Sequence, residues 1–175
     1  VVFVFDDLLT EGLDPSIAKK LSDVKTRHIF QGKAGEVYTT SIGSGRLRTK
    51  SRILFFVGLG KKEEFSPEQM RLSSGVVMQK ISYEGLVSVR VDCNLAVPHF
   101  SDIQDFAQSM TEGFILSDYR FDRFKSKKKS EKDKNRLKEI VIYVKSKFVK
   151  NFRKGINLGK IFSDAVSSFI RIFSS

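Results

Sequence analysis

The chain has 175 residues, of which 41% are hydrophobic and 29% are charged. This length and composition are typical of one globular domain and exclude an intrinsically disordered chain. The single cysteine, Cys93, excludes an internal disulfide framework, so we expect a reducing compartment and a cytoplasmic location. No stretch of the sequence approaches the ~18 uninterrupted apolar residues of a membrane span, so no membrane partner is expected.

The positive charge is concentrated in one part of the chain. The formal net charge is +11, and the segment 119–160 holds 16 Lys and Arg residues against 4 Asp and Glu residues. Within it, 125–136 contains no apolar residue, which is typical of a solvated loop. A nucleic-acid patch is the alternative interpretation. The aromatic residues just upstream are expected to anchor this loop to the core, namely Tyr119, Phe121 and Phe124.

The first half of the chain predicts alternating strands and helices. Residues 1–5 form a continuous apolar run, which indicates a strand buried on both faces and not a signal peptide. Asp14 and Pro15 are an N-cap and first-turn pair, and they predict a helix that ends near Val24. Runs of β-branched and apolar residues then predict two strands, over 36–40 and 52–58.

The second half continues the alternation. The Ser-x-x-Gln pattern of a capping box predicts helices over 66–81 and 101–117, with Ser66 and Ser101 as the N-caps. Between them, 86–91 alternates apolar and polar residues, which indicates a strand with one wetter face near a sheet edge. A buried strand is predicted at 140–144, and a helix is expected to finish the chain. The pattern favours an α/β fold, a sheet with helices on both sides.

Few residues in the chain support chemistry. The segment Gly58-Leu59-Gly60-Lys61-Lys62 can present backbone N–H groups to an anion, but it lacks the spacing of a P-loop, so a structural turn is favoured. Gly43-Ser44-Gly45 has the same interpretation. His28, His99 and Cys93 do not have the spacing of a zinc site, and Cys93 is expected to be a buried small hydrophobe. We therefore predict no catalytic, cofactor-binding or metal-binding residue in this chain.

Two motifs in a fixed order resemble the N-terminal domain of the leucine aminopeptidase (cytosol aminopeptidase) family. Residues 57–62 match the family's VGLGKK turn residue for residue. The stretch 112–125 fits its second motif, an EG pair followed by apolar residues and then Y-x-F-D-x-Y/F-K. The similarity continues through the strand at 140–144 to 155–158, and it covers roughly residues 1–160.

The resemblance implies a macro-like, three-layer α/β/α domain with a mixed sheet over 1–146. Residues 147–175 are expected to form a helix that leads toward a catalytic domain absent from the chain. In the family that domain removes N-terminal residues from peptides with two divalent metal ions such as Zn or Mn. This chain alone is therefore expected to be no enzyme and to hold no cofactor.

The resemblance also implies partners and a role. The expected partners are the catalytic domain of the parent enzyme and further copies of the chain, which form a hexamer in the family. The expected role is in assembly or regulation of that enzyme. The less favoured alternative is a nucleotide- or nucleic-acid-binding macro-like module that uses the basic segment 120–138.

Overall fold

The computed structural model describes residues 1–7, 10, 12–42, 52–118, 137–162 and 170–174. Within these ranges strands and helices alternate along the chain, as predicted. The main elements are β1 (Val2–Val4), α1 (Pro15–Thr26), β2 (Val37–Ile42), β3 (Arg52–Gly58), α2 (Pro67–Tyr83), β4 (Ser88–Asp92), α3 (Ile103–Asp118), β5 (Glu139–Val144), α4 (Val149–Phe162) and β6 (Ile170–Ser174). The predicted turn at 43–45 and the basic run 125–136 lie outside the described residues.

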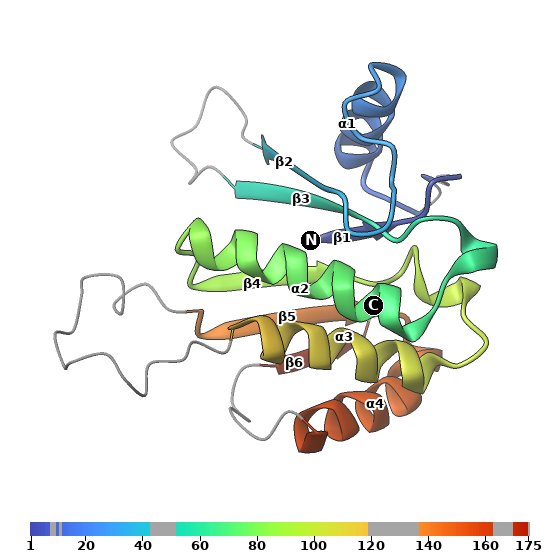
Figure 1. Cartoon of the computed structure of the whole chain (residues 1–175), viewed down its shortest axis with the longest axis vertical. Coiled ribbons are helices and arrows are strands. Elements are labelled where there is room, and N and C mark those ends of the chain that lie inside the picture. The colour runs from blue at the N-terminus through green and yellow to red at the C-terminus, as the bar shows by residue number, and fades with distance from the viewer. Residues whose placement is uncertain (8–9, 11, 43–51, 119–136, 163–169, 175) are drawn as a thin grey trace, which may run out of the picture.

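The strands form one mixed sheet in the order β2-β3-β1-β4-β5-β6. Among the strands that the structure describes, β2 alone pairs antiparallel with its neighbour, and the remaining pairs are parallel. Parallel neighbours require crossover connections, which the helices supply. Helices α2, α3 and α4 lie side by side over the sheet (Figure 1), where α3 packs against both of the others.

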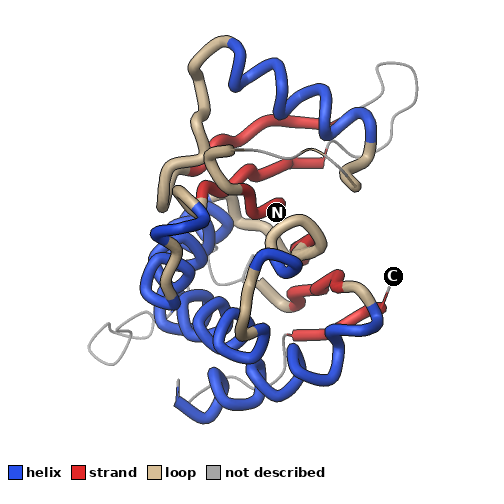
Figure 2. Tube along the Cα trace, turned by 90° about the vertical axis from the view of Figure 1, so that its right-hand side faces the viewer, coloured by secondary structure: helices blue, strands red, loops and turns tan. Residues whose placement is uncertain are grey.

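The two faces of β1 pack against different helices. Phe3 and Phe5 belong to the larger core, which is shared with α2, α3 and α4. Val2 and Val4 point to the other face, into a smaller core that Leu21 of α1 helps to close. Side chains alternate in this way because a strand has a period of two residues. Figure 2 shows α1 separated from the other helices by the strands. The predicted α/β fold with a mixed sheet is confirmed.

Two of the predicted helix starts have the cap that the sequence indicated. Asp14 Oδ1 accepts a hydrogen bond of 2.9 Å from the backbone N–H of Ser16. Ser66 Oγ accepts from the Gln69 N–H at 3.3 Å, and Gln69 Oε1 accepts from the Ser66 N–H at 2.9 Å. These bonds satisfy N–H groups that have no partner inside the helix, which is why each helix begins where it does.

The cap predicted for α3 is wrong by one residue. Asp102, and not Ser101, precedes the first helical residue. Its Oδ1 atom accepts hydrogen bonds from the backbone N–H groups of Gln104 at 2.8 Å and Asp105 at 3.0 Å. A carboxylate at this position also interacts favourably with the positive end of the helix dipole, so Asp102 is the stronger cap of the two neighbours.

The prediction that β4 lies near a sheet edge is also wrong. Strand β4 is internal and lies between β1 and β5. Its alternation is nevertheless correct, because Val89 and Val91 are buried while Ser88 and Arg90 are exposed. The exposed face has a different cause. In the described part of the chain, α1 covers that side of the sheet over β1 and β3, and no residue of β4 belongs to the core that α1 closes. The outer face of β4 is therefore left exposed.

The end of the chain departs from the predicted single helix. Helix α4 ends at Phe162, and 170–174 form β6, which runs parallel to β5. The sequence Ile170-Arg171-Ile172 has the two-residue period and β-branched character of a strand, which a helical interpretation of the tail overlooked. Phe152 and Ile156 of α4 lie in the larger core, so α4 packs as part of the same domain as the residues before 146.

Glycine residues determine how closely the helices approach each other. A Cβ atom added to Gly113 of α3 would lie 2.4 Å from the carbonyl oxygen of Arg71 on α2. A Cβ atom added to Gly155 of α4 would lie 2.2 Å from the carbonyl oxygen of Gln104 on α3. The close packing of the three helices therefore requires glycine at these positions, because a side chain would collide with the backbone of the neighbouring helix.

None of the helices in the described ranges is both long and apolar enough to span a membrane.

Candidate functional site

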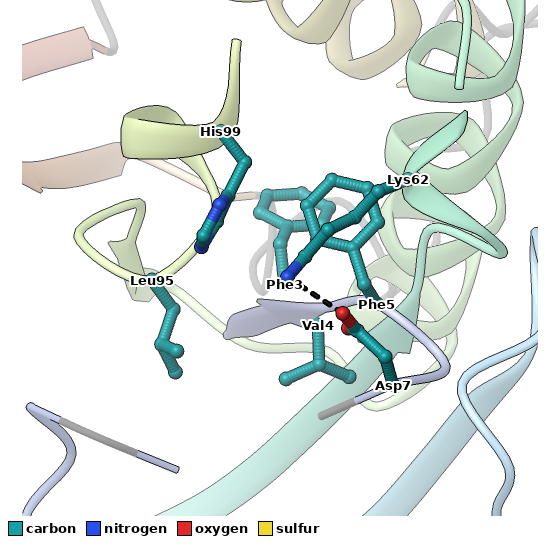
Figure 3. Close-up of a pocket in the computed structure, with 7 residues that line it drawn as sticks. All are labelled: Phe3, Val4, Phe5, Asp7, Lys62, Leu95 and His99. Atoms are coloured by element: carbon teal, nitrogen blue, oxygen red, sulfur yellow. Dashed lines mark ion pairs between the residues drawn. The ribbon is translucent and has the colours of Figure 1, made fainter. Parts of the chain in front are cut away.

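The candidate site is a small hollow at the carboxyl ends of β1 and β4, which are neighbouring parallel strands. The chain leaves β1 toward β2 and β3 on one side of the sheet, and it leaves β4 toward β5 on the other side. Open α/β sheets bind ligands at such switch points. The hollow is lined by Phe3, Val4, Phe5, Asp7, Lys62, Leu95 and His99 (Figure 3).

The hollow is too small for an organic ligand. Its volume is about 10 Å³, which is room for roughly one water molecule. Pockets for nucleotides and other small molecules usually measure ~300–1,000 Å³. As the described residues shape it, this hollow has no room for a nucleotide.

The two charged groups at the hollow neutralise each other. Lys62 Nζ lies 2.6 Å from Asp7 Oδ2, as the dashed line in Figure 3 marks. The same Nζ atom lies 5.8 Å from the centre of the Phe5 ring, a distance at which the ring attracts a cation. Because Lys62 already has an anionic partner, it is not a free cation for a bound anion.

The turn that carries Lys62 is held by backbone contacts. Gly60 has a φ of +78°, a conformation that favours glycine. Its N–H donates to the Gly32 carbonyl at 2.8 Å, and its carbonyl accepts from the Asp6 N–H at 3.0 Å. Gly58 has a different role, since a Cβ atom there would lie 2.0 Å from the Lys33 carbonyl oxygen. The glycines of 58–62 therefore shape a turn that joins three segments.

The residues weighed for nucleophilic or metal chemistry do not form a site. Cys93 is fully buried, and its Sγ atom lies 3.8 Å from Met110 Sδ. Burial raises the pKa of the Cys93 thiol well above its usual value, so the prediction of a buried small hydrophobe is confirmed. His99 is exposed and meets the Phe5 ring edge-on at 6.0 Å, whereas His28 follows α1. The described residues contain no group of three His, Cys, Asp or Glu side chains that could hold a metal ion.

Sequence reasoning missed a charged contact between α2 and α3. Arg71 Nε donates to Glu112 Oε2 at 2.5 Å, and Gln108 Nε2 donates to Glu112 Oε1 at 2.8 Å. The Glu112 side chain is only 9% exposed. The hydrogen bond to Glu112 raises the pKa of the Arg71 guanidinium. A lone acid within the mostly apolar run 110–116 was the signal that could have revealed this pair, because a buried charge requires a partner.

Neither of the described residues of the basic segment 120–138 lines the hollow. The structure describes only Leu137 and Lys138 of this segment. Leu137 is buried in the larger core, and Lys138 is exposed while its backbone N–H donates to the Val87 carbonyl at 2.8 Å. The alternative interpretation as a nucleic-acid-binding module depended on the whole segment 120–138, and its remaining part, 120–136, lies outside the described residues.

The fold defines a class of protein: an α/β/α domain with a mixed sheet, in which the described motif residues Gly58, Gly60, Lys62, Glu112 and Gly113 make internal contacts. A family model described as "Cytosol aminopeptidase family, N-terminal domain" matches residues 1–128. The chain belongs to the cytosol aminopeptidase family, and its matched part is that family's N-terminal domain.

Relatives and solved structures agree with this assignment. A probable cytosol aminopeptidase of Aquifex aeolicus is 32% identical over 149 residues, covering 85% of this chain and 26% of that protein. One of Sulfurihydrogenibium is 26% identical over 89% of this chain and 29% of its own length. A mutant tomato leucine aminopeptidase has the same fold, with a TM-score of 0.58 and 16% identity over 88% of this chain and 31% of that one. The bottromycin maturation enzyme BotP gives a TM-score of 0.56 with 16% identity over 93% and 30%. The chain thus spans less than a third of each of these proteins.

Proposed function

We propose that this domain supports the assembly or regulation of a leucyl aminopeptidase and does not itself hydrolyse peptides. The observation that carries the proposal is the match of residues 1–128 to the family's N-terminal domain, in a chain that covers 26% of its Aquifex aeolicus relative. On this proposal, hydrolysis belongs to a separate catalytic domain that holds two divalent metal ions such as Zn or Mn. The domain works with that catalytic domain and with further copies of itself, as a hexamer in the cytoplasm.

The internal contacts of the domain support a structural role. The charged motif residues Glu112 and Lys62 are paired with Arg71 and Asp7. The hollow at the switch point has room for roughly one water molecule. These residues are therefore engaged in holding the domain together, which suits a rigid accessory part of a larger enzyme.

An activity assay tests the catalytic half of the proposal. The purified chain is incubated with leucine p-nitroanilide and either Mn²⁺ or Zn²⁺, next to the full-length Aquifex aeolicus relative as a positive control. The expected result is release of p-nitroaniline by the control alone. Metal-dependent turnover by the chain would show that it carries a complete active site, and the proposal would be wrong.

Light scattering coupled to size exclusion tests the assembly half. The chain is measured alone over a range of concentrations and again after mixing with the full-length relative. An assembly role predicts that the chain self-associates or enters the relative's oligomer. A monomer under every condition would remove this role, whatever the outcome of the activity assay.

A further inference from the structure

The strand-to-helix connection before α4 and the helix itself carry positive charge only. Residues 145–162 contain six Lys and Arg residues and no Asp or Glu residue. Five of the six are exposed in the structure, and we call them the basic face of α4: Lys145 and Lys147 in the connection just before the helix, and Lys150, Arg153 and Lys154 on the helix. The sixth, Lys160, is half-buried.

The core fixes the orientation of this face. Phe152 and Ile156 point from α4 into the larger core with 0% and 3% exposure. Gly155 lies against the backbone of α3, where no side chain would fit. Helix α4 is the outermost helix of the layer in Figure 1, so its opposite side faces solvent. Three members of the basic face, Lys150, Arg153 and Lys154, are therefore presented outward by a rigidly packed helix.

The ion pairs of the described fold do not use these charges, although Lys147 Nζ lies 4.7 Å from the centre of the Phe148 ring. None of the four ion pairs found among the described residues includes a member of the basic face. Solvated helices commonly place acidic residues three or four positions from basic ones, and α4 has none. The first turn of α4 also lacks an acidic residue, although cations near a helix N-terminus are unfavourable. Such local violations of an electrostatic rule are typical of functional surfaces.

We propose that the basic face of α4 binds the phosphate backbone of a nucleic acid without reading its sequence. A basic stripe along one helix in a protein with a pI near 9.8 is the electrostatic pattern of such binding. The exposed amides of Asn151 and Asn157 lie on the same helix, and amide side chains commonly donate to phosphate oxygens. The face holds no carboxylate that would repel a phosphate.

The composition of the face favours nucleic acid over an acidic protein. Protein interfaces are enriched in aromatic residues and depleted in Lys, whereas four of the five residues of the basic face are Lys and none is aromatic. These five residues include no aromatic side chain on which a base could stack.

The spacing along the helix fits a phosphate backbone. Lys147, Lys150 and Lys154 follow each other at steps of three and four residues. Lys147 lies in the short 3₁₀ helix Ser146–Phe148, which is followed directly by α4, and the other two lie on α4 itself. At a rise of 1.5 Å per residue they cover roughly 10 Å. One strand of duplex DNA carries a charge about every 3.4 Å along its axis, so this length corresponds to about three phosphates.

The test compares two triple variants of the whole chain with the same change in charge. The first removes charge from the basic face, as Lys150→Gln, Arg153→Gln and Lys154→Gln. The control removes two Lys and one Arg from exposed positions on or next to α1 and α2, as Lys19→Gln, Arg27→Gln and Lys80→Gln. Far-UV circular dichroism and thermal melts establish that both variants are folded.

Binding is measured by fluorescence anisotropy with a labelled short DNA duplex of arbitrary sequence, at salt concentrations between about 50 and 200 mM. Each lost phosphate contact reduces the slope of log affinity against log salt by about 1. The α4 variant is expected to lose about 3 from this slope and to bind at least ~10-fold more weakly at the lowest salt. The control variant is expected to keep the original slope.

Several outcomes would overturn the proposal. The first is that the original chain does not bind the duplex at low salt. The second is that both variants lose the same affinity, which would reflect net charge alone. Poly-L-glutamate or vesicles of phosphatidylserine and phosphatidylcholine serve as competing anions. If either bound more tightly than the duplex and lost affinity only in the α4 variant, the partner would be an acidic protein or a membrane surface instead. None of these results bears on the aminopeptidase assays, so the two proposals fail independently.

Discussion

Replacing Gly155 with alanine tests how α4 is held against α3. A Cβ atom at this position would lie 2.2 Å from the Gln104 carbonyl oxygen and 2.8 Å from the Ala107 Cβ atom, whereas ordinary contact begins at 3.4 Å. Neither obstacle can rotate away, because one is backbone and the other is fixed to it. The helices must therefore separate, which loosens the packing of Phe152 and Ile156 in the larger core.

Opposing effects set the size of the change. In a helix interior alanine is favoured over glycine by about 1 kcal/mol. Overpacking costs about 1–3 kcal/mol, and partial exposure of two buried side chains adds about 1–2 kcal/mol, a fraction of what their full burial contributes. We expect the Gly155→Ala variant to be destabilised by about 2 kcal/mol. In a domain of this size that lowers the melting temperature by roughly 4–8 °C.

The measurement is urea unfolding of the whole chain by far-UV circular dichroism, supported by thermal melts. Asn157→Ala is the matched control because Asn157 is exposed on the same helix, and its stability should stay within about 0.5 kcal/mol of the original. Gly159→Ala should be intermediate, since its Cβ atom would lie 2.8 Å from the Gln108 carbonyl oxygen. A Gly155→Ala variant as stable as the original chain would refute the close-approach argument.

Three further predictions concern residues placed by the structure. Glu112→Gln should lower the free energy of unfolding by about 1–2 kcal/mol, because the Arg71 guanidinium loses a charged hydrogen-bond partner but stays partly solvated. Urea titration measures this, and an unchanged midpoint would contradict it. Gly60→Ala should cost about 1–2 kcal/mol, because residue 60 has a φ of +78° that strains any L side chain. Lys61→Ala, at an exposed neighbouring position, is its control in the same titration, and equal stability of the two variants would disprove the strain. The thiol of Cys93 should resist a disulfide reagent in the folded chain and react once urea unfolds it, because burial excludes the reagent and raises the thiol pKa. Rapid labelling without urea would show that the Cys93 thiol is accessible in the folded chain, which would contradict its buried position.

The parts of the fold that were predicted correctly depend on local interactions. The caps at Asp14 and Ser66 are recognisable because the capping side chain and the N–H it binds lie within three residues. The strand at 1–5 is recognisable because five buried residues in a row require two covered faces. Signals of this kind are complete within a short window of sequence, so no knowledge of the tertiary structure is needed to interpret them.

The parts that were missed depend on contacts between distant segments. The position of β4 inside the sheet is set by pairing with β1 and β5, and a half-exposed strand looks the same at an edge or in the interior. The Arg71–Glu112 pair joins residues 41 positions apart. The candidate site illustrates the same limit, since the sequence indicated a structural turn at 58–62, but the pairing of Lys62 with Asp7 required the folded arrangement.

The described residues of the two motifs that identify the family make contacts within the domain. In the first motif, Gly58 and Gly60 allow the turn to approach the 32–34 segment. In the second, Glu112 binds Arg71 while Gly113 lets α3 rest on the backbone of α2. Both sets of contacts lie within the domain, so these residues serve its internal packing. The basic face of α4 has the opposite character, because its side chains make no ion pair that the described fold requires. A ligand of this domain is therefore to be sought on that face, and the paired variants on α4 and on the α1 and α2 surfaces separate its contribution from that of net charge.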